Sequence, residues 1–229
     1  MKIKILGTRG EIEESARFHS KKSGVLLDKK ILLDFGEKEF LKHKPKYILI
    51  THLHPDHAYF VRNNEKPKIK IPIYAPEKYD DLNIHIINKK FEIEDYKITP
   101  IPTIHSIKVK SNAYLIEHKN KKILYTGDMI WIEKKYHHLL KNLNLIITES
   151  SYKRKGGMVR RSKAGQIFGH TGIPNLINLF KDYTDKIIFM HFGAWFYKDI
   201  RKSKDFFKKL SQENNLEIIV GYDGLEIKI

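Results

Sequence analysis

Three histidines and one aspartate lie within six positions of each other in the segment Thr51–His57, which reads THLHPDH. The segment follows a short apolar run that predicts a buried strand delivering these side chains to a loop. Alternate residues of an extended chain share a side, so His52 and His54 face the same way. The intervening proline then turns the path, so that Asp56 and His57 face a neighbouring point. Imidazole and carboxylate groups bind zinc, manganese and iron, and the segment therefore predicts a metal site.

The composition restricts the chemistry of such a site. The chain has 229 residues, 41% of them hydrophobic, and it contains no cysteine. Disulfides, thiolate metal sites and cysteine nucleophiles are excluded, so any metal must be held by histidine and carboxylate. Lysine and arginine number 43 against 27 aspartate and glutamate, a net charge of +16. This charge favours an anionic ligand or partner, nucleic acid included, although a Lys- and Ile-rich composition bias explains it equally well.

The elements that must position these residues are short strands, followed in the second half by alternating strands and helices. One domain over residues 1–229 is expected, because no linker rich in Pro, Gly and Ser interrupts the chain. Apolar runs predict strands at Lys2–Leu6, Gly24–Asp28, Ile31–Phe35, Tyr47–Thr51, Ile71–Tyr74, His85–Ile87, Lys97–Pro102, Ser111–Glu117, Lys121–Thr126, Leu145–Thr148, Lys186–Met190, Leu216–Val220 and Leu225–Ile229. Helices are expected at Pro76–Leu82, Trp131–Leu140, Pro174–Asp182 and Lys198–Leu210. Layered sheets covered by helices, an α/β architecture, follow from this order.

The apolar runs are too short for a membrane protein. No stretch of about 18 apolar residues predicts a membrane-spanning helix. The opening segment Met1–Gly7 is too short, and too interrupted by lysine, for the apolar region of a signal peptide. We therefore expect a cytoplasmic protein with no membrane partner.

The histidine segment resembles the H-x-H-x-D-H signature of the metallo-β-lactamase superfamily, and further motifs of that superfamily follow in the same order. The opening MKIKILGTRG resembles its first strand and glycine turn, and LLDFG resembles the motif whose aspartate, here Asp34, supports the metal loop. His105 in TIHS, Asp128 in YTGD and His191 in MHFG stand at the places of its later ligands. The resemblance spans almost the whole chain and implies the four-layer αβ/βα sandwich of that superfamily in a single domain.

The resemblance also implies two divalent metal ions, with zinc expected first and manganese or iron compatible. Two groups of three ligands and one bridging residue are implied: His52, His54 and His105 for the first metal, Asp56, His57 and His191 for the second, and Asp128 between them. A hydroxide that bridges two cations is a nucleophile near neutral pH, because the cations lower the pKa of the shared water. Asp56 and Asp128 would position it. Histidine rather than glutamate at position 54 argues against the redox di-iron branch and favours hydrolysis.

A second pair of residues resembles the phosphodiesterase branch of the superfamily, which includes ribonuclease Z. Glu149 ends an apolar strand in TESSY, and His170 precedes a helix in GHTG. By resemblance, His170 would protonate the leaving oxygen or stabilise its charge, while Glu149 would orient His170 and raise its pKa. A histidine that only caps a turn is the structural alternative.

The segment between these two residues is rich in basic side chains around a pair of glycines. Arginine binds phosphate through paired hydrogen bonds, and glycines permit a loop to move. We expect a flexible loop near the mouth of the metal site that holds the phosphate, with a merely solvated loop as the alternative. Its basic residues are Lys153, Arg154, Lys155, Arg160, Arg161 and Lys163.

The sequence therefore predicts a dinuclear metal-dependent hydrolase that acts on an anionic phosphodiester, similar to small phosphodiesterases of cyclic phosphates. The chain lacks the cysteines of the extra structural zinc site in one such relative, and the long Gly-rich arm with which ribonuclease Z grips transfer RNA. A tRNA 3′-processing endoribonuclease is thus a weakened alternative. A lactonase or thioesterase, and a nucleic-acid-binding protein with a non-catalytic metal site, are the others. A homodimer is compatible with the resemblance.

Overall fold

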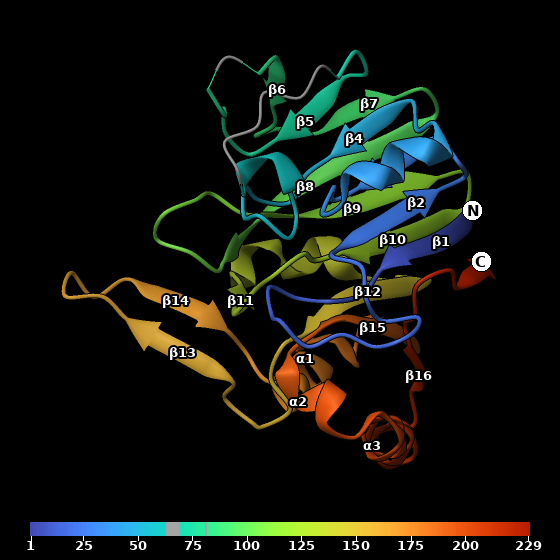
Figure 1. The fold of residues 1–229 in the computed structure, drawn as a ribbon, viewed down its shortest axis with the longest axis vertical. Coiled ribbons are helices and arrows are strands. Elements are labelled where there is room, and N and C mark those ends of the chain that lie inside the picture. Colours follow the sequence, from blue (N-terminus) through green and yellow to red (C-terminus); the bar gives the residue numbers. More distant parts are fainter. Residues whose placement is uncertain (63–68, 81) are drawn as a thin grey trace.

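Two large β-sheets pack against each other in the computed structural model, which describes residues 1–62, 69–80 and 82–229 (Figure 1). The first sheet has seven strands in the order β17-β1-β2-β3-β4-β5-β6. Its strands are β1 (Lys2–Gly7), β2 (Gly24–Leu27), β3 (Ile31–Leu33), β4 (Tyr47–Leu49), β5 (Ile73–Ala75), β6 (Ile84–Ile86) and β17 (Glu226–Lys228). Strands β3 to β6 run parallel, so their carboxyl ends meet at one edge of the sheet.

The second sheet has eight strands, with β7 paired to β8 beside the order β11-β8-β9-β10-β12-β15-β16. They are β7 (Phe91–Ile93), β8 (Tyr96–Ile104), β9 (Asn112–His118), β10 (Lys121–Tyr125), β11 (Trp131–Ile132), β12 (Leu145–Ser150), β15 (Lys186–Phe192) and β16 (Glu217–Val220). Strand β12 is buried along its whole length, as expected of a parallel strand covered on both faces. The helices are α1 (Ile173–Phe180), α2 (Ala194–Lys198) and α3 (Ile200–Asn214).

Three apolar clusters define the layers. One lies between the sheets and includes Ile5 of β1 and Ile147 of β12. A second joins the outer face of the second sheet to the helices, with Phe207 of α3 in its core. The third covers the outer face of the first sheet, where Phe40 and Phe60 from two short 3-10 helices (Lys38–His43 and Tyr59–Val61) are buried. The predicted four-layer α/β sandwich in a single domain is confirmed.

Two predicted helices are wrong. Residues 131–132 of the predicted helix Trp131–Leu140 instead form β11, because their backbone pairs with β8, and only a 3-10 helix (Lys134–Leu140) follows. The predicted helix Pro76–Leu82 contains residue 81, which lies outside the described residues, and its described part is irregular. Asp80 there has a positive φ of 40°, a conformation that ends helices.

The remaining helices start and end close to where the sequence places them. Lys198, where the sequence places the start of the last helix, is instead the final residue of α2, a helix that was not predicted. Asp199 then has an extended backbone, and its side chain accepts a hydrogen bond from the backbone N–H of Lys202 at 3.0 Å. A side-chain acceptor before the first turn is the ordinary way to begin a helix, so α3 starts at Ile200. No helix in the described part of the chain is long and apolar enough to cross a bilayer.

The basic stretch Lys153–Lys163, which was expected to be a flexible loop, is only partly one, because its residues Met158–Arg161 form the first strand of a β-hairpin. Strands β13 (Met158–Arg161) and β14 (Ile167–His170) pair with each other as a separate two-stranded sheet. Figure 1 shows this hairpin, the β13–β14 arm, projecting from the body of the molecule.

Candidate metal centre

The predicted ligands come from four segments that follow or belong to strands of both sheets. His52 and His54 follow β4, His105 follows β8, Asp128 follows β10, and His191 lies in β15. The fold brings all seven predicted ligand residues into two groups that share Asp128. Within each group, one possible ligand atom per residue lies within 4.8 Å of the others. The seven side chains therefore form one compact, mostly buried cluster.

The first group consists of three imidazoles with Asp128. Nδ1 of His54 lies 3.1 Å from Nε2 of His52 and 3.2 Å from Nε2 of His105. Three nitrogens bound to one tetrahedral zinc ion would lie roughly 3.3 Å apart, given Zn–N bonds of about 2.0–2.1 Å. Burial and the neighbouring His105 lower the pKa of His54 to about 4. Neutral imidazoles with converging nitrogens are the donor set that a divalent metal requires.

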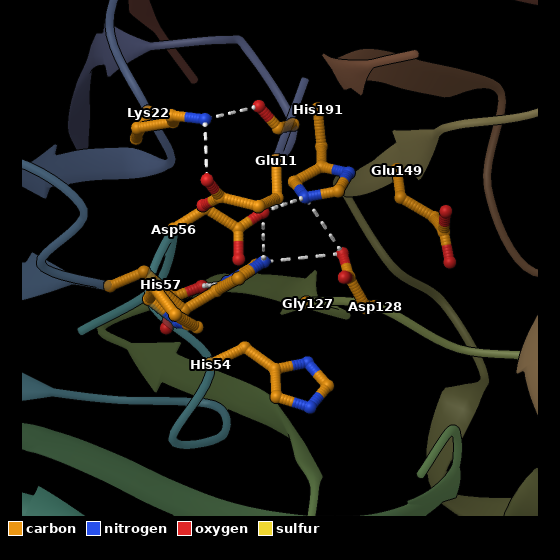
Figure 2. A network of polar contacts seen from close by, with 12 residues as sticks. Glu11, Lys22, His54, Asp56, His57, Gly127, Asp128, Glu149 and His191 are labelled. Carbon is orange, nitrogen blue, oxygen red and sulfur yellow. Dashed lines mark hydrogen bonds and ion pairs between the residues drawn. The ribbon is translucent and has the colours of Figure 1, made fainter. Parts of the chain in front are cut away.

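The second group consists of two imidazoles and two carboxylates (Figure 2). Nε2 of His191 lies 2.8 Å from Oδ2 of Asp56, and Nε2 of His57 lies 3.3 Å from Oδ1 of Asp128. Among the described residues, Nε2 of His57 and Oδ1 of Asp128 are buried without a hydrogen-bond partner. Such orphaned polar atoms are rare and need a partner. A cation between them would supply one, so the residues fit a second metal.

Asp34 lies beneath this cluster and is fully buried. Its Oδ2 accepts hydrogen bonds from Nδ1 of His57 at 2.7 Å and from the hydroxyl of Tyr125 at 2.7 Å. Its Oδ1 accepts from the backbone N–H of Thr51 at 2.7 Å. The expected support of the metal loop therefore has a geometric basis, because these bonds fix the ring orientation of His57. Sequence reasoning missed Tyr125, because no motif distinguishes it as a partner of Asp34.

Glu149 and His170 meet at the edge of the first group. Nδ1 of His170 lies 2.9 Å and 3.0 Å from the two carboxylate oxygens of Glu149, and 3.9 Å from Oδ2 of Asp128. Glu149 also accepts a hydrogen bond from the backbone N–H of Met129 at 2.7 Å. Burial alone would lower the pKa of His170, but the carboxylates of Glu149 and Asp128 outweigh it and raise the pKa to about 9. The two carboxylates thus favour the protonated imidazole, the form in which His170 can act as an acid.

A cavity of about 320 Å³ opens onto the centre. Tyr152 and Trp195 line one part of it, and the segment Gly10–Ile12 lines another. A buried lysine holds that segment: Nζ of Lys22 lies 2.9 Å from the carbonyl oxygen of Gly10 and 3.3 Å from the carboxylate of Glu11 (Figure 2). Sequence reasoning missed Lys22, since nothing distinguishes it from the other lysines before the fold is known.

None of the six basic residues predicted to hold phosphate is among the described residues that line this cavity, and all six are exposed. Nζ of Lys153 lies 4.6 Å from the ring centroid of Phe206, and the guanidinium of Arg154 donates to the carbonyl oxygen of Gly157 at 3.0 Å. Arg161 donates to the carbonyl oxygen of Gly165 at 3.1 Å. These side chains would therefore contact only those parts of a substrate that extend outside the cavity.

Comparison with known proteins places these residues in a family context. The family model described as Beta-lactamase superfamily domain matches residues 36–192. This range includes all seven predicted ligands as well as Glu149 and His170. No curated protein sequence matches the chain.

Solved structures with the same fold cover nearly the whole chain. The metallo-β-lactamase fold protein YhfI from Bacillus subtilis has a TM-score of 0.73 at 16% identity, over 99% of this chain and 98% of that one. A diphosphatase from the PhnP family has a TM-score of 0.70 at 16% identity, over 100% and 97%. The short form of human tRNase Z has a TM-score of 0.63 at 17% identity, over 100% and 99%. At these identities the likeness establishes the fold.

Proposed function

We propose that this chain, a member of the family described as Beta-lactamase superfamily domain, is a two-metal phosphodiesterase. One observation carries the choice of a phosphodiester: His170, paired with Glu149, lies beside the carboxylate that both ligand groups share. A phosphodiester leaves as an alkoxide, which needs a proton donor. Hydrolysis of an activated lactone or thioester has less need of one.

His52, His54 and His105 would hold one divalent ion, Asp56, His57 and His191 the other, and Asp128 would contact both. When bound, such ions lower the pKa of a shared water and neutralise charge on the phosphate oxygens. Zinc is the first candidate, since five of the six ligands other than the shared Asp128 are imidazoles, and imidazole suits zinc. Manganese and iron accept the same donors, so the physiological metal is to be measured.

The protein's own groups would then orient the reaction. Asp56 and Asp128 would accept hydrogen bonds from the attacking water and fix its direction. His170 would give its proton from Nε2 to the leaving oxygen, because Nδ1 is engaged by Glu149. Burial of Glu149 keeps this pair away from bulk water, which strengthens the interaction between the two side chains.

The exposed basic residues would bind anionic groups of the substrate outside the cavity. Arg160, Arg161 and Lys163 lie on the projecting arm, and Lys153 to Lys155 precede it. A cavity of about 320 Å³ would take one small group of the substrate, leaving a longer anionic part to reach these cations. The same arm favours RNA 3′-end processing as a second candidate function, because its exposed cations would contact an anionic RNA. This arm lies between Glu149 and His170 and is not the Gly-rich arm of ribonuclease Z.

Metal content and hydrolysis, measured together, test the proposal. The purified protein should bind about two zinc or manganese ions and hydrolyse bis-p-nitrophenyl phosphate. A His52→Ala/His54→Ala variant should lose both properties, and His170→Ala should retain metal but lose hydrolysis of an alkyl phosphodiester, whose leaving group needs a proton. Preferred turnover of lactones or thioesters that survives His170→Ala would instead favour the carboxylic-ester alternative. Salt-dependent RNA binding with no cleavage in any metal would favour a binding protein.

A further inference from the structure

The root of the β13–β14 arm is bonded directly to a predicted metal ligand. The backbone N–H of Gly169 donates to the carbonyl oxygen of His105 at 2.7 Å. In return, Nδ1 of His105 donates to the carbonyl oxygen of Gly169 at 3.0 Å. A ligating imidazole is oriented by the bond that its other nitrogen makes. Gly169 therefore fixes both the backbone and the ring of His105, with Nε2 directed at the cluster.

The residues that follow Gly169 join the arm to two further parts of the centre. His170, the last residue of β14, bonds to Glu149. The backbone N–H of Thr171 donates to the carbonyl oxygen of Met129, the residue after Asp128, at 3.1 Å. Three consecutive residues at one end of the arm are thus bonded to three different segments of the centre.

Position 169 accepts only glycine without rearrangement. Gly169 has a φ of 119°, a backbone conformation that L side chains rarely adopt. A Cβ built there would lie 2.0 Å from the carbonyl oxygen of Met158 on the paired strand. Any side chain would force β13 and β14 apart at the point where β14 contacts His105.

We propose that the β13–β14 arm is a positioning element of the metal centre, acting through Gly169 on His105 as a ligand and on His170 as the proton donor. Its effect on His170 rests on the proposed function, whereas its effect on His105 concerns metal binding alone. The two can fail separately, because zinc affinity is measured without a substrate.

Gly169→Ala is the direct test, with Gly165→Ala as its matched control. Gly165 has a φ of 82° in the turn of the same arm, and nothing lies within 4 Å of a Cβ built there. Both substitutions place a side chain at a positive φ, but only the first opens the root of the arm. We expect Gly169→Ala to bind one of two zinc ions roughly 10- to 100-fold more weakly in a chelator competition. Gly165→Ala should bind both zinc ions within about twofold of the wild type.

A shortened arm provides a second test if Gly169→Ala does not fold. Residues 161–167 are replaced by Asn-Gly, which joins the directly opposed Arg160 and Phe168 through a two-residue turn and keeps Gly169. We expect the same zinc site to weaken several-fold. The Nδ1 proton of His105, observed by NMR in histidine-labelled zinc protein, should exchange faster with water.

Wild-type affinity for both zinc ions in every folded variant would overturn the proposal. A kcat for an alkyl phosphodiester that falls with little change in KM would support the part that concerns His170.

Discussion

Oδ2 of Asp34 lies 2.7 Å from Nδ1 of His57, and both residues are buried. The same carboxylate accepts hydrogen bonds from the backbone of Thr51 and from the hydroxyl of Tyr125. Asp34 therefore hydrogen-bonds to three parts of the site: Thr51 at the start of the metal loop, the ligand His57, and Tyr125 at the end of β10. Because Nδ1 of His57 is engaged by Asp34, Nε2 is left to face Asp56 and Asp128.

Asp34→Asn should weaken both the fold and the metal centre. An amide retains only one acceptor oxygen, so at least one of the buried donors loses its partner, at a cost of about 1–3 kcal/mol. His57 also loses the carboxylate that orients it, which should reduce metal affinity roughly 10- to 100-fold. Urea unfolding of the metal-free protein and zinc competition measure the two effects. Tyr125→Phe is the control: it removes one donor to Asp34 and should leave zinc affinity close to that of the wild type.

His170→Gln should affect substrates according to their leaving group. A proton donor accelerates departure of a poor leaving group by about 10²- to 10⁴-fold, but p-nitrophenolate leaves without much help. We therefore expect a large loss of kcat for an alkyl phosphodiester and a much smaller loss for bis-p-nitrophenyl phosphate. Rates across a series of leaving groups measure this as a steeper dependence on leaving-group pKa. Equal losses for all leaving groups would argue against proton donation by His170.

The ligand cluster could be predicted from the sequence because its spacing is local. His52, His54, Asp56 and His57 lie in one short segment after an apolar run, and the turn at the proline divides them between two groups as expected. His105, Asp128 and His191 lie far apart in the chain, and only the resemblance placed them with the others. Strand periodicity alone could not have done so, since it does not specify which strands become neighbours.

The arm and the irregular segments could not be predicted, because they depend on tertiary contacts. The short strand β11 exists only where β8 offers it a pairing edge, so a helical pattern over Trp131–Leu140 was misleading. Gly169 had no visible role before its close approach to Met158 was known. Lys22 became distinct only through its burial against the carbonyl oxygen of Gly10.

Lys22→Met should loosen one wall of the cavity without removing a ligand. Lys22 is 3% exposed and bonds to the carbonyl oxygen of Gly10 and to Glu11, and these bonds hold the Gly10–Ile12 segment in place. Hydrogen bonds of a charged group contribute about 1.5–3 kcal/mol, so we expect KM to rise roughly tenfold with a smaller change in kcat. Lys21→Met is the matched control, since Lys21 is much more exposed and pairs with Glu39 away from the cavity. A tenfold fall in kcat at constant KM would contradict a role in the cavity wall.

His19 should make the fold less stable as the pH falls from about 6.5 to about 4. Burial lowers the pKa of His19 to about 4, with Asp223 opposing and Lys204 adding to the shift. The unfolded chain takes up a proton near pH 6.5, whereas the folded protein does so only near pH 4. The stabilising contribution is therefore complete above pH 6.5 and is lost on acidification, by roughly 1–2 kcal/mol after allowance for solvent screening.

Urea unfolding of the wild type and of His19→Phe at several pH values tests this contribution. Phenylalanine preserves the ring contacts of His19 with Phe192 and Phe196 but cannot titrate. The free energy of unfolding of the wild type should fall by roughly 1–2 kcal/mol more than that of His19→Phe between pH 7 and pH 4. Parallel pH profiles for the two proteins would show that His19 does not carry the effect.

Removal of metal should lower the melting temperature markedly, because the ligands are drawn from segments distant in the chain. A ligand present at about 1,000 times its dissociation constant stabilises the folded state by about 4 kcal/mol. For a chain of this size, that corresponds to a change in melting temperature of roughly 8–16 °C. Thermal unfolding with zinc and with a chelator measures the difference.

Magnesium prefers oxygen ligands and should give a much smaller shift than zinc at the imidazole-rich group. His52→Ala/His54→Ala should lose much of the zinc-dependent shift, and an unchanged shift in that variant would place the stabilising zinc elsewhere.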